Sequence, residues 1–142
     1  IWCSSLIPQE NQLEILNNQA DIDTALRLLD NKLQNKYLFG FKDPRVSVLL
    51  PFWQKIFKLC NINVSYLIAI RNPLSVALSL QKRDQFSIKK GLFLWFEHVV
   101  ASLQQTQNLN RILVHYEDLM SKPVEVINTI AEKFNLQINP FN

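Results

Sequence analysis

The sequence predicts an α/β fold whose strands form a parallel sheet. Short apolar segments of strand length alternate along the chain with amphipathic segments of helical length. Parallel strands need helical crossovers between them, and this alternation supplies them. The 142 residues fit one domain, and the three expected strands, at 37–41, 64–70 and 112–114, are few for such a sheet. We therefore expect residues 1–142 to form a single, partial domain.

The stretch from Val64 to Arg83 is the clearest strand-to-helix junction in the chain. It begins with β-branched and aromatic residues, as in a strand that is buried on both faces. Asn72 is a favoured helix N-cap and Pro73 is pre-set for the first helical position. Arg71 therefore stands at the carboxyl end of a strand, beside a helix N-terminus. Open α/β sheets bind their ligands at this edge, and the position suits anions.

Arg71 and the hydroxyl groups on the following helix form a candidate anion clamp. Ser75 and Ser79 are four residues apart and share one helix face, which Arg83 extends. A guanidinium group offers a fork of donors that matches phosphate. The alternative is a solvated arginine followed by serines of no special role, and spacing alone does not separate the two interpretations.

The remaining helices follow from apolar residues at helical spacing and from their caps. Ser87 is a candidate N-cap of a long helix, and Pro123 opens the last one. Residues 116–118, which follow the last strand, are interpreted as a structural turn that hydrogen-bonds a nearby loop. The expected helices run from about residue 21 to 33, 47 to 60, 73 to 83, 87 to 107, and from 121 onward.

A second group of candidate residues follows the expected strand at 37–41. Lys42 would lie at the same sheet edge as Arg71 if the two strands are parallel neighbours. A lysine there can stabilise negative charge that develops on a transferred group. Asp43 is a candidate proton acceptor from a substrate hydroxyl, and Arg45 a candidate substrate-binding residue. The alternative is a charged turn with an Asp43–Arg45 ion pair.

Three segments, in the same order along the chain, resemble the sulfotransferase family that uses 3′-phosphoadenosine 5′-phosphosulfate (PAPS). The match to that family's 3′-phosphate signature is RNPLSVALSL at residues 71–80. The bacterial and carbohydrate sulfotransferases have a KDPR segment similar to LFGFKDPRVSVLLPFW at 38–53. Their closing segment is similar to VHYEDLMSKPVEVINTIAEKF at 114–134.

This resemblance implies a partial three-layer α/β/α fold of the P-loop NTPase type that lacks its first strand. It implies that Arg71 and Ser79 bind the 3′-phosphate of PAPS, with no metal, and that Lys42 acts on the sulfonate as it moves to a hydroxyl or amine acceptor. The acceptor class stays open between a small molecule, a carbohydrate and another substrate. The alternative function is a truncated or degenerate, non-catalytic module that at most binds nucleotide.

Two departures from the family pattern keep this alternative open. The two glycines, Gly40 and Gly91, lie outside the expected strand-to-helix loops, so the chain has no counterpart of the loop that wraps the 5′-phosphosulfate. Either that loop lies upstream of Ile1 or it has been lost. No histidine stands beside Lys42, where the cytosolic branch of the family has its base. We interpret His98 as a residue of the long helix that packs or faces solvent, and His115 as non-catalytic because it has no nucleophile partner.

Composition excludes several other classes of protein. A net charge of +3 is too small, and on composition too dispersed, to indicate a nucleic-acid surface. Cys3 and Cys60 have no metal-type spacing and indicate reduced thiols. The sequence has no apolar stretch of membrane-spanning length and no signal peptide. We expect a cytoplasmic location, with an upstream targeting or anchor segment as the open alternative.

Overall fold

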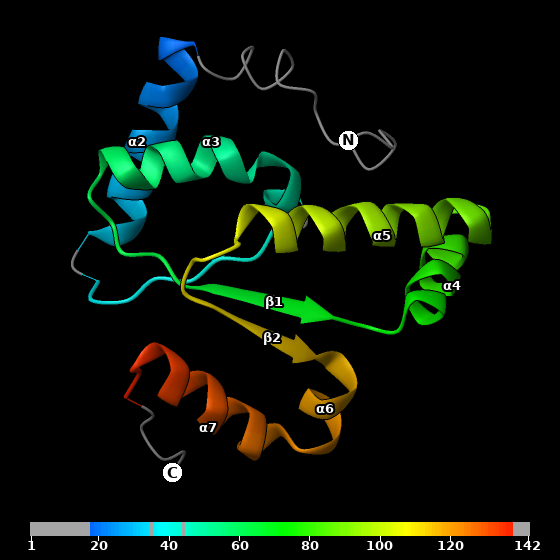
Figure 1. Ribbon diagram of the computed structural model, residues 1–142. Coiled ribbons are helices and arrows are strands. Elements are labelled where there is room, and N and C mark those ends of the chain that lie inside the picture. Colours follow the sequence, from blue (N-terminus) through cyan, green and yellow to red (C-terminus); the bar gives the residue numbers. More distant parts are fainter. Residues whose placement is uncertain (1–17, 35, 44, 138–142) are drawn as a thin grey trace. The chain divides into compact units, whose positions relative to one another are not determined.

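The computed structural model describes residues 18–34, 36–43 and 45–137. It is a mostly helical α/β structure with a small parallel sheet of two strands (Figure 1). The chain divides into two compact units, residues 1–63 and 64–142, and each is described by itself.

The first unit contains helices α2 (Gln19–Leu33) and α3 (Val46–Leu59). The side chain of Asn18 caps α2 by accepting a hydrogen bond from the Asp21 N–H group. The two helices pack against each other. An extended segment, residues 36–43, follows α2 and residue 35 in the chain and precedes residue 44 and α3. The buried residues of the two helices are Ile22, Ala25 and Leu29 on α2 and Leu50, Ile56 and Phe57 on α3.

The prediction of a strand at residues 37–41 is wrong. Residues 36–43 are extended but pair with no strand among the described residues. Phe39 and Phe41 point to the same side, where their rings stack with centroids 6.0 Å apart. Phe41 also contacts Trp53 of α3, at 5.8 Å between centroids. Aromatic packing against a helix, and not strand pairing, therefore holds this segment.

The second unit contains the sheet. Strands β1 (Tyr66–Ile70) and β2 (Arg111–His115) are parallel, and Ile70 pairs with His115 at their carboxyl ends. The connection between them consists of helices α4 (Pro73–Asp84) and α5 (Ile88–Gln105), and β2 is followed by α6 (Tyr116–Ser121) and α7 (Pro123–Phe134). Helices α5 and α7 lie on opposite sides of the strands (Figure 1). The sequence-predicted caps are confirmed: Asn72 caps α4 and Ser87 caps α5.

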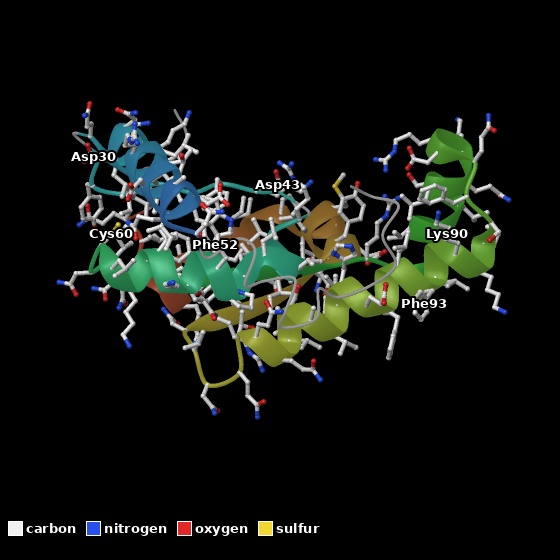
Figure 2. All side chains as sticks on the ribbon, turned by 90° about the horizontal axis from the view of Figure 1, so that it is seen from above. Asp30, Asp43, Phe52, Cys60, Lys90 and Phe93 are labelled. Carbon is white, nitrogen blue, oxygen red and sulfur yellow. The ribbon has the colours of Figure 1, made fainter. Side chains whose placement is uncertain are left out.

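The α4–α5 pair packs closely because of a glycine. A Cβ atom on Gly91 would lie 2.8 Å from the Cα atom of Ala77, inside normal contact distance. Gly91 and Ala77 are both buried where the two helices meet. The side chain of Phe93, in contrast, points away from α4 and is 49% exposed (Figure 2). Gly91 thus serves helix packing and has no role in a phosphate loop.

No helix described between residues 18 and 137 has both the length and the hydropathy needed to cross a lipid bilayer.

Candidate functional site: an anion site at the end of strand β1

The carboxyl ends of β1 and β2 bring Arg71 next to residues that follow β2. The guanidinium carbon of Arg71 lies 4.6 Å from the ring centroid of Tyr116, a cation–π contact. The indole N–H group of Trp95 donates to the Arg71 carbonyl oxygen at 3.0 Å. Arg71 is therefore fixed at both its backbone and its side chain, although it is exposed.

The donors of the Arg71 guanidinium group have no acceptor in the described part of the chain. Among residues 18–34, 36–43 and 45–137, no side chain or carbonyl group accepts a hydrogen bond from it, and no carboxylate forms an ion pair with it. A stacked guanidinium still presents its N–H groups in the plane of the fork, where they match a phosphate or sulfonate. This arrangement is suited to binding an oxyanion.

The helix N-terminus beside Arg71 has already used its own donors. The side-chain oxygen of Asn72 accepts from the N–H groups of Leu74 and Ser75, at 3.0 and 3.1 Å. The N–H group of Val76 donates to the Asn72 carbonyl oxygen, and Pro73 has no N–H group. Side-chain donors, and not backbone amides, must therefore supply most of the hydrogen bonds to an anion here.

Glu117 places a negative charge at the same edge. Its Oε1 atom accepts from the Asn72 N–H group at 3.2 Å. This bond, a backbone bond within Glu117, and the nearby charges of Arg71 and His115 lower the pKa of the Glu117 carboxyl. The ionised carboxylate opposes a second anion nearby, so it reduces the affinity of the site.

Ser79, the other predicted donor to the 3′-phosphate, lies on α4 with an exposed side chain. It is six residues beyond Pro73, which corresponds to about 9 Å along the helix axis. Arg71 and Ser79 share no hydrogen bond in the described part of the chain. Ser75, one turn closer to Arg71, is half-buried. Arg83 is engaged by Asp84, with a shortest contact of 2.6 Å, so it does not extend the clamp.

Lys42, Asp43 and Arg45 belong to the first unit, and Lys42 does not end a paired strand. Asp43 lies at the end of the extended segment (Figure 2) and forms an ion pair with Arg45. Its Oδ1 atom accepts from the backbone N–H and from Nε of Arg45, both at 2.8 Å, and its Oδ2 atom accepts from Nη2. These bonds lower the pKa of Asp43 to about 2. A carboxylate with so low a pKa is a weak proton acceptor.

Sequence reasoning missed the functional contacts of two aromatic residues. Tyr116 was expected only as part of a structural turn, whereas Tyr116 and Trp95 both contact Arg71. The expected hydrogen bond from the 116–118 turn to a nearby loop is confirmed by Glu117 and Asn72, although the turn is the short helix α6. The contact between Arg71 and Tyr116 could have been predicted, because residues that follow two parallel strands meet at one sheet edge.

Comparison of the chain with models of protein families, with curated proteins and with solved structures finds no match.

Proposed function

We propose that the chain binds the adenosine nucleotide PAPS through an anion site centred on Arg71, and that it transfers the sulfonate group to a hydroxyl or amine acceptor. One observation carries the proposal: a guanidinium group fixed on Tyr116 at the carboxyl end of a parallel strand, with no acceptor of its own among the described residues. The three segments that resemble PAPS-dependent sulfotransferases support the same ligand.

In this proposal each candidate residue has one role. Arg71 binds the 3′-phosphate through its fork of N–H groups, and Ser79 adds a hydroxyl donor. Lys42 neutralises the charge that develops on the sulfonate during transfer. Arg45 binds the acceptor, and Asp43 takes the proton of the acceptor after its ion pair with Arg45 opens. The fold that would unite these residues is a three-layer α/β/α domain of the P-loop NTPase type.

The second candidate function is non-catalytic nucleotide binding. It is favoured by the glycine positions, since Gly91 lies within α5 and Gly40 within the extended segment 36–43. Neither can form a loop that wraps a diphosphate-like group between a strand and a helix. In this case the site binds the 3′-phosphate and turns over no PAPS.

Calorimetric titration with adenosine 3′,5′-bisphosphate tests the shared part of both functions. We expect saturable binding that weakens about tenfold or more in Arg71→Ala, because a charge-assisted hydrogen bond contributes about 1.5–3 kcal/mol. Arg71→Lys should recover only part of the affinity, since lysine lacks the fork. The matched control is Arg27→Ala, which removes an exposed arginine from α2 in the first unit.

Glu117→Gln is expected to change the affinity for the nucleotide in the direction opposite to Arg71→Ala. The amide keeps an oxygen that can accept from the Asn72 N–H group but removes the negative charge near Arg71. We expect this variant to bind the nucleotide several-fold more tightly. Equal affinity in the wild-type chain, Arg71→Ala and Glu117→Gln would refute an anion site at this edge.

A further inference from the structure

The first unit contains a cavity of about 360 Å³ that the proposed nucleotide site does not use. It lies between α2, the extended segment 36–43 and the beginning of α3, and all of its lining residues belong to the first unit. A cavity of this size is at the lower end of the range for small-molecule sites. It is large enough for a compound of two fused rings.

The walls of this cavity are apolar and largely aromatic. Phe39, Phe41 and Trp53 line it, and the Phe41 ring is tilted by 57° against the Trp53 ring. Phe41 is 47% exposed, so a large apolar surface remains uncovered beside the cavity. Flat apolar molecules gain most from such walls, through burial and through offset or edge-on ring contacts.

The charged residues that line the cavity sum to one positive charge, and the ammonium group of Lys36 lies close by, 5.5 Å from the ring centroid of Phe39. Asp43 and Arg45 line it as an ion pair, so their charges compensate each other. Lys32, in the last turn of α2, also lines the cavity, and no carboxylate pairs with it among the described residues. The pKa of Asp43 near 2 keeps that carboxylate, and with it the ion pair to Arg45, ionised at neutral pH.

We propose that this cavity binds a small aromatic carboxylate or a similar apolar monoanion, with its rings against Phe41 and Trp53 and its charged end near Lys32. The aromatic walls favour a flat apolar body, and the positive charge of Lys32, with that of Lys36 nearby, favours a negatively charged end. This proposal does not depend on nucleotide binding, because the residues that carry it, Lys32, Phe41 and Trp53, have no role in the proposed nucleotide site.

Three isosteric probes test the preferred charge: 2-naphthoate, 2-naphthylmethanol and 2-naphthylmethylammonium. Binding to the full chain is followed by calorimetry and by the indole N–H signal of Trp53 in ¹H–¹⁵N spectra, assigned with Trp53→Phe. We expect naphthoate to bind with a Kd on the order of 10⁻⁴ M. The alcohol should bind several-fold more weakly, and the ammonium compound more weakly still.

Variants on the rim locate the site. Lys32→Gln should weaken naphthoate binding about threefold to tenfold. Leu28 also lines the cavity and is 50% exposed, so Leu28→Glu should fold. It places a carboxylate one turn before Lys32, where it pairs with the lysine and repels the ligand, and we expect a loss of at least tenfold. The matched control is Lys58→Gln on α3, which lies outside the cavity lining.

The outcomes separate this proposal from its competitors. Near-ultraviolet circular dichroism verifies that each variant is folded. No saturable naphthoate binding at millimolar concentration, equal binding of the ammonium probe, or equal affinity in Leu28→Glu and Lys58→Gln would each overturn it. Titration of Leu28→Glu with adenosine 3′,5′-bisphosphate should give the wild-type affinity, so failure at one site is distinguishable from failure at the other.

Discussion

The Asp43–Arg45 ion pair can be measured at the level of a single residue. Asp43 has a pKa of about 2, lowered from 3.8 mainly by the side-chain hydrogen bonds from Arg45. A carboxyl whose pKa is lower in the folded chain stabilises the fold above pH 3.8, and that stabilisation is lost as the pH falls toward 2. We expect ¹³C NMR titration of the Asp43 carboxyl carbon to give an apparent pKa near 2.

Arg45→Gln is the matched test of the cause. Without the guanidinium group, the Asp43 pKa should rise toward 3.8, because both the side-chain hydrogen bonds and the opposite charge are lost. Lys42→Gln should raise it less, since Lys42 contributes the smallest of the lowering effects. An Asp43 pKa that stays near 2 in Arg45→Gln would contradict this interpretation of the pair.

The charged groups of the candidate site were easier to predict from the sequence than the residues that they contact. The guanidinium at the end of β1 and the carboxylate beside Lys42 were evident from the sequence. The choice between a free Asp43 and an ion pair depended on local backbone geometry, which places the Arg45 N–H and Nε groups on one carboxyl oxygen. The Arg71–Tyr116 contact depended on the pairing of two strands more than 40 positions apart, which no local pattern shows.

At the scale of elements, a substitution of Gly91 tests how closely α4 packs against α5. In an exposed helix, alanine is favoured over glycine by about 1 kcal/mol. Here the added Cβ atom would lie 2.8 Å from a backbone atom of Ala77, so the helices must separate, at a cost of about 1–3 kcal/mol. We expect Gly91→Ala to be destabilising overall, measured as a lower midpoint of urea unfolding.

Gly40 provides the control for this substitution. A Cβ atom on Gly40 meets no atom within 4 Å, and its φ angle is not positive. Gly40→Ala should therefore leave stability unchanged or raise it by up to about 1 kcal/mol, by restricting the unfolded chain. A Gly91→Ala chain as stable as Gly40→Ala would show that the two helices have room to adjust.

The elements that the sequence predicted correctly are those with local signals at their ends. Asn72 with Pro73, and Ser87, define two helix starts through contacts within three residues. The prediction of a strand at 37–41 is wrong because a short apolar segment of strand length can also pack its aromatic rings against a helix. Strand pairing is a long-range property, and the segment's partner proved to be a helix.

At the scale of the whole molecule, the net charge is concentrated and not dispersed as composition suggests. Residues 82–90 contain four basic residues and one acidic residue, which equals the +3 of the entire chain. Lys89 and Lys90 lie at the start of α5, and Lys82 and Arg83 lie at the end of α4, about 15 Å from Arg71 along the helix axis. This exceeds the Debye length of about 8 Å at physiological salt, so the anion site depends on Arg71 and not on this cluster.

The proposed sulfonate transfer assigns Lys42 and Arg71 to the same nucleotide, and the ratio of the affinities for two ligands tests this assignment. PAPS differs from adenosine 3′,5′-bisphosphate by the sulfonate group that Lys42 is proposed to contact. We expect the wild-type chain to bind PAPS more tightly, by about tenfold for one charge-assisted contact. In Lys42→Met this preference should disappear, while the affinity for the bisphosphate stays the same.

Lys36→Met is the matched control, because Lys36 is exposed in the same extended segment but lies over the ring of Phe39. It should keep the wild-type preference for PAPS. If Lys42→Met also keeps it, Lys42 does not reach the sulfonate, and only the part of the proposal carried by Arg71 stands. Loss of both affinities in Arg71→Ala, together with loss of only the PAPS preference in Lys42→Met, would indicate that the two units act on one donor molecule. That combination separates a transferase from a module that binds nucleotide alone, without knowledge of the acceptor.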